Sequence, residues 1–259
     1  MFVVIIMFDL THILYTSISF LIIAVLLILC YKYVKDDKYK DLVLKISSVI
    51  VVVLHFSPLY VDYFSSGSAS VGSSYLLPIF PCHLMMWSLL IIAFKKRNNK
   101  FFNTLIEITF YIGTVGGILG EVLNDAYLNN PSLGDWNVLS GLLSHSVMTF
   151  GCLYLLVGGY FKVSVKNTIS VAIGIVFLAV YGLFIVGLFS MFKLDPPNTM
   201  YLLEKPYPEF PWINTYTIAI AGVSAAYLIT STYELIAFDK EDRWYNKIKN
   251  KKLLNDNNK

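Results

Sequence analysis

Seven stretches of about 20 mostly apolar residues, each long enough to cross a bilayer as a helix, follow one another along this chain. They lie at residues 12–34, 42–61, 75–94, 101–121, 138–160, 165–191 and 212–238. A membrane-spanning segment satisfies its backbone internally, and a helix does this within one segment. We therefore predict an all-α fold, a polytopic membrane bundle of about seven transmembrane helices.

The composition agrees with a membrane location. Of the 259 residues, 56% are hydrophobic and 14% are charged, whereas soluble domains are about 25% charged. An aromatic share of 15% argues against disorder, and three cysteines are too few for a disulfide-stapled scaffold. The apolar residues 1–10 carry no basic segment and no small-residue cleavage site, so we predict no cleaved signal peptide.

The basic residues predict the orientation. Eighteen of the 20 lysines and arginines lie in alternate loops and in the tail, and only Lys193 and Lys205 lie on the other side. Cytoplasmic loops carry such an excess, so we expect the amino terminus outside the cell membrane and the carboxyl terminus in the cytoplasm. Residues 1–238 then form a single transmembrane domain and 239–259 a basic cytoplasmic tail. Orientation alone explains the basic tail, and we expect no nucleic-acid partner.

Three side chains that are unusual inside a membrane share one predicted depth. Cys82 and His145 lie seven residues from the outer ends of their predicted spans, and His55 lies seven from Asp62, the residue after its span. Seven residues are about 10 Å at 1.5 Å per residue. Polar groups at such depths are functional candidates. Glu121 and Asn124 end the fourth span and are expected to reach the same layer. By contrast, we expect the inner Glu107 and Glu234 to meet cytoplasmic headgroups or loop lysines.

Cys82 stands in the segment LLPIFPCHLMMW, in which Pro78 and Pro81 are compatible with a helix that begins there and not with a helix interior. The thiol then lies near a helix amino terminus and beside His83. The helix dipole and His83 both favour a thiolate, so a nucleophilic cysteine with a histidine base is one interpretation. Metal binding by this cysteine and the histidines is the alternative, but their spacing matches no metal motif. We predict no metal and no cofactor.

Glycines and prolines mark two further segments. The stretch YIGTVGGILG contains two pairs of glycines four residues apart, which favours close helix packing over a glycine-lined substrate path. The segment KLDPPNTMYLLEKPYPEFPW holds five prolines and several aromatic residues. A lid or re-entrant loop and a simple interfacial anchor both fit this composition.

Four stretches together resemble one family. They are YLLPIFPCHLMMWSLL, LIEITFYIGTVGGILGEVLND, GLLSHSVMTFGCLYLL and NTMYLLEKP followed by PWINTYTI. In these stretches the chain resembles the bacterial YwaF and animal transmembrane protein 164 (TMEM164) family from about Tyr75 to the end of the last span. The most specific elements are the Leu-Pro-x-x-x-Cys element ending at Cys82, the pair Ser144 and His145, and the block 198–206.

The resemblance implies a membrane acyltransferase that acts on phospholipids. In that family the residue matching Cys82 carries the acyl group, and the residue matching His145 assists it. We add His83 as a second candidate base and expect five residues to contact the substrate: His55, Glu121, Asn124, Asn198 and Tyr201. Bacterial relatives often have histidine at the position of Phe80; here His83 is three residues further on, which on a helix is nearly the same face.

A different class of function also fits the sequence. A membrane transporter or a lipid- or solute-binding protein would use the same polar pocket without covalent chemistry. The seven spans show no inverted repeat and no matching pair of broken helices, which argues against a secondary transporter. Membrane phospholipids are therefore the expected partners, and the sequence does not indicate an oligomeric state.

Overall fold

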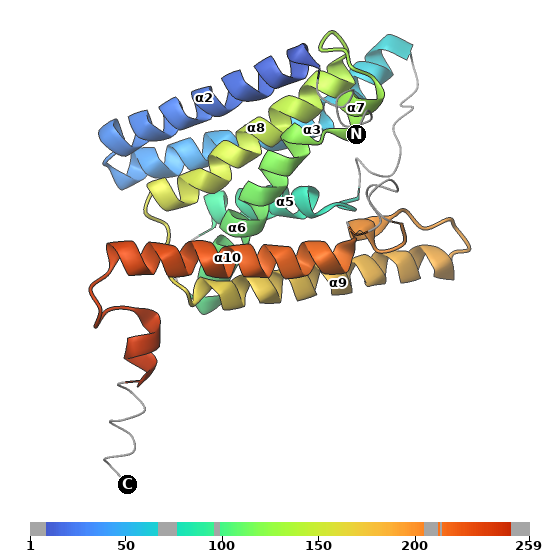
Figure 1. Cartoon of the computed structure of the whole chain (residues 1–259). Helices are drawn as coiled ribbons and strands as arrows, with labels where there is room; N and C mark the ends of the chain where they lie inside the picture. Colours follow the sequence, from blue (N-terminus) through green and yellow to red (C-terminus); the bar gives the residue numbers. More distant parts are fainter. Residues whose placement is uncertain (1–8, 67–76, 96–98, 205–211, 213, 250–259) are drawn as a thin grey trace.

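The computed structural model describes residues 9–66, 77–95, 99–204, 212 and 214–249. The described part is a bundle of helices (Figure 1). The long helices are α2 (Leu10–Tyr33), α3 (Asp37–Ser66), α5 (Pro81–Phe94), α6 (Lys100–Val122), α8 (Trp136–Val157), α9 (Asn167–Met191) and α10 (Thr215–Ala237). Two short elements, α7 (Asp125–Asn129) and the 3₁₀ turn η1 (Thr199–Tyr201), lie in connections.

Six of these helices are long and apolar enough to cross a membrane, and α5 is shorter. Its 14 residues extend about 21 Å, whereas the sequence predicts a full span at 75–94. The described residues 77–80 before it are not helical, and 75–76 lie outside the described residues. The helical part of the predicted third span is therefore shorter than expected and begins at Pro81.

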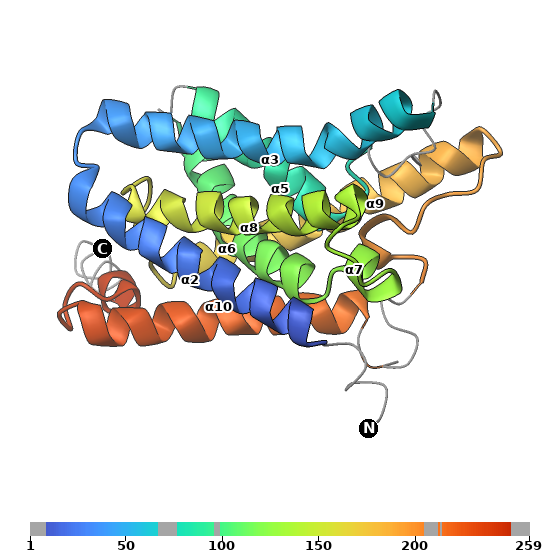
Figure 2. The same cartoon turned by 90° about the horizontal axis from the view of Figure 1, so that it is seen from above.

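The chain nevertheless crosses the bundle between α3 and α6. Helices α2, α5, α8 and α10 begin at one end of the bundle, where α3, α6 and α9 finish (Figures 1 and 2). We call this the Trp136 end and the other the lysine-rich end. Because α3 finishes at the Trp136 end and α6 begins at the opposite one, α5 and the segment before it complete a seventh crossing.

Helix α8 occupies the middle of the bundle and packs against α2, α3 and α6 (Figure 2). Helix α5 fills the space between α3 and α6, and α9 joins α10 to the bundle through contacts with α6. The exposed aliphatic side chains of α2, α9 and α10 are those expected of helices that face lipid.

Two glycines let α6 approach its neighbours closely. A Cβ atom on Gly113 would stand 2.5 Å from Cys152 Sγ, and one on Gly117 would stand 2.3 Å from Thr149 Oγ1. Neither distance is compatible with a side chain on α6, so the backbone of α6 lies against α5 and α8 here. The predicted small-residue contact is confirmed at these two positions.

The two glutamates at the lysine-rich end hold the bundle together. Glu234 accepts hydrogen bonds from the Ser164 hydroxyl and from the backbone N–H groups of Val165 and Trp244. Glu107 accepts one from Ser170 of α9. Neighbouring segments of the chain thus supply hydrogen-bond donors to both glutamates, and Lys247 of the tail also lies close enough to Glu234 to interact with its charge. Their contact with headgroups stays a prediction.

Candidate functional site

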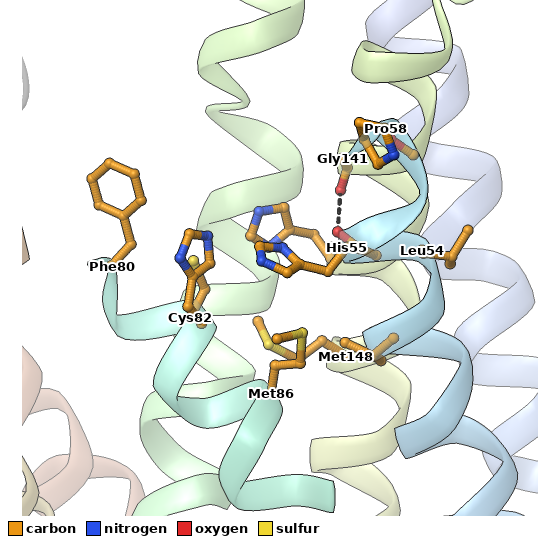
Figure 3. A pocket seen from close by; sticks show the side chains of 13 residues that line it. Leu54, His55, Pro58, Phe80, Cys82, Met86, Gly141 and Met148 are labelled. Carbon is orange, nitrogen blue, oxygen red and sulfur yellow. Dashed lines mark hydrogen bonds between the residues drawn. The ribbon is translucent and has the colours of Figure 1, made fainter. Parts of the chain in front are cut away.

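A cavity of about 180 Å³ lies between α3, α5 and α8 and contains the reactive side chains singled out above (Figure 3). It holds Cys82 and three of the four histidines of the chain. The residues that line it are Val51, Leu54, His55, Pro58, Phe80, Cys82, His83, Met86, Ser140, Gly141, Ser144, His145 and Met148. The structure thus brings the predicted His55, Cys82, His83 and His145 together.

The start of α5 places the thiol. Phe80 has extended backbone (φ −109°, ψ 155°) and caps the helix, and Pro81 is its first residue. This confirms a helix that begins at the prolines and makes Cys82 the second helical residue. In this first turn Pro81 has no N–H, and the N–H groups of His83 and Leu84 donate to the Phe80 carbonyl at 3.1 and 3.4 Å. Among the described residues, the Cys82 N–H is the one group of the turn without such a bond, and it points toward the end of the helix where the cavity lies. Figure 3 shows Cys82 at this end of α5.

Helix α6 forms the wall behind the thiol. A Cβ atom on Gly116 would stand 4.0 Å from Cys82 Cβ, and one on Gly120 would stand 2.2 Å from His145 Cε1. Residues four apart lie on one face of a helix, about 6 Å apart along its axis. Cys82 and the His145 imidazole therefore lie against consecutive turns of the same glycine face.

The rings of His55, His83 and Phe80 pack together in the cavity. The His83 ring centroid lies 4.5 Å from that of His55 and 5.4 Å from that of Phe80. No described residue forms a hydrogen bond with Nδ1 of His83 or of His145. No lysine, arginine, aspartate or glutamate is among the described lining residues. The cavity is therefore polar and uncharged when its histidines are neutral.

The helical argument that equates positions 80 and 83 is wrong, because Phe80 precedes α5 and has extended backbone. The two rings nevertheless lie in contact, edge to face. A ring at position 83 therefore occupies space next to the position where bacterial relatives often carry histidine.

On the α3 side, a proline is accommodated by a short relay of hydrogen bonds. Pro58 has no N–H to give to the carbonyl of Leu54, one turn earlier. The Ser57 hydroxyl donates to that carbonyl at 2.8 Å, and Trp136 Nε1 donates to Ser57 Oγ at 2.9 Å. This relay ties α3 to the start of α8 where His55 enters the cavity.

Four predicted contact residues lie outside the cavity lining. Glu121 is fully buried, and its backbone carbonyl lies 3.0 Å from Nε2 of His12 on α2. Asn124 caps α7 by accepting from Tyr127 N–H and donates to the Gly120 carbonyl. Both hydrogen-bond within the packed end of the bundle.

Asn198 and Tyr201, the other two predicted contact residues outside the cavity lining, lie in the segment before α10. The Asn198 oxygen accepts from the N–H groups of Leu203 and Glu204, and its amide donates to the Glu204 carbonyl. The Tyr201 ring lies 5.3 Å from that of Phe80. Met200 N–H donates to the Ile79 carbonyl at 2.9 Å, so this segment packs against the entry to α5.

Sequence reasoning did not select Ser140, Gly141, Met86 and Met148 as lining residues, and it read the Gly116–Gly120 pair as packing alone. Serine, glycine and methionine are too common in apolar helices to carry a signal. Gly141 and Met148 lie four and three residues from His145, and Met86 lies four from Cys82, which places these three on the same faces. It also did not select His12, which is buried against α6 and α7.

Across the described ranges, no three His, Cys, Asp or Glu side chains converge in a way that could hold a metal ion. A cysteine, neighbouring histidines and a helix amino terminus are components of nucleophilic chemistry.

Comparison with known proteins gives one match. No curated protein and no solved structure matches the chain significantly. The sequence model of the TMEM164 family does match, from residue 7 to residue 233, and so covers every helix that surrounds the cavity. With most of its length inside that match, the chain belongs to the TMEM164 family.

Proposed function

We propose that this protein is a membrane acyltransferase that moves an acyl chain between phospholipids, with Cys82 as the nucleophile and His145 as the base. The observation that carries the proposal is that Cys82 and His145 lie against consecutive turns of one glycine face of α6, in one cavity. We take the cavity to lie beneath the outer headgroups of the cell membrane, at the depth of a lipid ester.

In the first step the thiol becomes acylated. The His145 imidazole takes the proton of Cys82, and the thiolate attacks the carbonyl carbon of a donor ester. The oxyanion accepts a hydrogen bond from the Cys82 N–H at the start of α5. The ester C–O bond then breaks, the leaving alkoxide takes the proton from the imidazolium, and a lysophospholipid departs from a thioester.

In the second step the acyl chain moves to the acceptor. The hydroxyl of a second lysophospholipid gives its proton to His145 as its oxygen attacks the thioester carbonyl. The C–S bond breaks, and the thiolate recovers the proton from the imidazolium. No nucleotide or metal takes part, because the ester that breaks and the ester that forms have similar energies and the proton returns to the thiol.

His145 fits the role of base better than His83. Residues that follow one another on a helix point about 100° apart, so the His83 ring turns from the thiol toward Phe80 and His55. His145 comes from a different helix and reaches the α6 wall that Cys82 also contacts. We assign His83 and His55 to the part of the cavity that receives the lipid ester.

The test is a covalent one. Purified protein in nanodiscs is incubated with a phospholipid that carries an alkyne-tagged acyl chain. We expect a labelled protein band that hydroxylamine removes and that Cys82→Ala abolishes. His145→Ala should slow its formation by about 10²-fold or more, the usual contribution of a general base.

Cys30→Ala is the matched control, because Cys30 is a free, partly exposed cysteine of the same chain and lies near the lysine-rich end of α2. It should leave the labelled band unchanged. If the band persists in Cys82→Ala, or if wild type and Cys82→Ala change phospholipid composition equally, the transferase proposal fails. Saturable lipid binding without any adduct would favour the non-enzymatic carrier or lipid-binding protein.

A further inference from the structure

The contact between Gly120 and His145 is tighter than packing between helices requires. A Cβ atom on Gly120 would lie 2.2, 2.4 and 2.6 Å from Cε1, Nδ1 and Nε2 of the His145 ring. All three atoms belong to the functional end of the imidazole. The ring therefore lies flat against the backbone of α6, in space that any side chain at position 120 would occupy.

The backbone of α8 has no room to relieve such a conflict. About one turn before Gly120 in α6, a Cβ atom on Gly117 would already lie 2.3 Å from Thr149 Oγ1 and 3.3 Å from the His145 carbonyl oxygen. Thr149 Oγ1 also donates to that carbonyl at 2.8 Å. The helices are in contact at this level, so a larger residue at position 120 displaces the imidazole and leaves the helix in place.

The neighbouring Gly116 provides a contrast within the same face. A Cβ atom there would lie 4.0 Å from Cys82 Cβ, an ordinary van der Waals contact. Alanine therefore fits at position 116 and conflicts with His145 at position 120. Both changes replace glycine by a better helix former in the same helix.

We propose that Gly120 is a positioning residue, which seats the His145 imidazole against α6 one turn from Cys82 and so allows it to take the thiol proton. The inference rests on the proposed function for its meaning, because it assigns His145 as the partner of Cys82. It also gives Gly120 a role in the site in addition to helix packing, whereas Gly116 makes an ordinary packing contact with Cys82.

The test reads the thiol without any lipid. Full-length protein in detergent is treated with iodoacetamide at pH 7, and the alkylation rate of Cys82 is followed by mass spectrometry, which resolves the three cysteines. We expect Gly120→Ala to slow Cys82 alkylation by about tenfold or more, as does His145→Ala, because a displaced base leaves the thiol protonated. Gly116→Ala should stay within about twofold of wild type.

A double variant distinguishes displacement of the His145 ring from a general disturbance of helix packing. If Gly120 acts only through His145, Gly120→Ala/His145→Ala reacts no more slowly than His145→Ala alone. If Gly120→Ala does not fold, the same double variant decides, because removing the ring removes the conflict. Recovered folding then supports the inference, and persistent misfolding overturns it.

Three results overturn the inference: a wild-type rate in Gly120→Ala, an equal loss in Gly116→Ala, or a His145→Ala rate equal to wild type. The acyl-adduct experiment distinguishes this failure from failure of the proposed function. Slow alkylation in Gly120→Ala without any adduct in wild type would refute acyl transfer and leave the positioning role intact. An adduct that forms equally in wild type and Gly120→Ala would refute the positioning role alone.

Discussion

Glu121 and Glu234 are 0% and 2% exposed, yet their carboxyl groups have different surroundings. Glu234 accepts three hydrogen bonds, two of them from backbone N–H groups. No hydrogen bond of ordinary geometry from the described residues reaches either side-chain oxygen of Glu121, although the hydroxyls of Ser19 and Ser146 lie near them. A buried charge is costly unless it is paired or hydrogen-bonded, so a negative charge is stabilised at position 234 and opposed at position 121.

The two glutamine variants should therefore have opposite effects on stability. Glu121→Gln keeps the shape of the side chain and removes the ionisable group, so we expect the thermal midpoint in detergent to stay unchanged or rise by a few degrees. Glu234→Gln weakens hydrogen bonds to a charged acceptor, and the free energy of unfolding should fall by about 1–3 kcal/mol. Thermal unfolding followed by intrinsic fluorescence measures both, and the reverse order of midpoints would contradict this account.

Single residues show where sequence reasoning succeeds. Seven-residue offsets from predicted span ends place His55, Cys82 and His145 at one depth, and the structure brings them into one cavity. Glu121 has a comparable depth but lies on a face of α6 that meets α2. Depth follows from chain position, whereas the direction of a side chain depends on the rotation of each helix, which packing decides.

At the scale of elements, α2 has few buried side chains, and polar contacts help to hold it in the bundle. Its buried residues are His12 and Ile23, and its amino terminus is held by Asp9. That carboxylate accepts from His12 N–H at 2.7 Å and from the Tyr127 hydroxyl at 2.8 Å. These two hydrogen bonds hold the pKa of Asp9 below its ordinary value of 3.8.

The lowered pKa predicts a pH-dependent contribution to stability. A carboxyl whose pKa is lower in the folded state stabilises the protein above its unfolded pKa, and this contribution is lost as the pH falls through the folded value. Asp9→Asn keeps an oxygen that caps α2 but has no charge. We expect its thermal midpoint to lie below that of wild type at neutral pH, and the difference to disappear as the pH falls through the lowered pKa of Asp9. Tyr127→Phe should reduce this difference, and a difference that is constant with pH would contradict the assignment.

The short helix α5 shows why a predicted span and an observed helix can differ. Residues 75–80 are apolar enough to extend a hydropathy window, but Pro78 and Pro81 prevent a helix from continuing through them. Hydropathy indicates which residues lie in the membrane, whereas the positions of the prolines indicate where helical hydrogen bonding begins. The helix start at Pro81, beside Cys82, was predictable because it depends on the positions of the prolines.

For the whole molecule, the basic residues predict which end of the bundle faces the cytoplasm. Helix α2 begins at the Trp136 end and α10 finishes at the lysine-rich end (Figure 1), as an odd number of crossings requires. A green fluorescent protein fused after Lys259 should fluoresce, and alkaline phosphatase at the same position should be inactive. A phosphatase fusion after Asp135, at the opposite end, should be active. The opposite pattern at both positions would reverse the proposed orientation.

The short α5 also links chemistry to the membrane in which the protein resides. Cys82 lies twelve residues from Phe94 at the far end of this helix, about 18 Å along its axis. That length is fixed, whereas the thickness of the hydrocarbon region changes with the length and saturation of the lipid chains. If the lysine-rich end is anchored at one surface, thicker bilayers place the thiol farther from the opposite ester layer. The lipids that the protein would remodel thus also set the distance between its nucleophile and their esters.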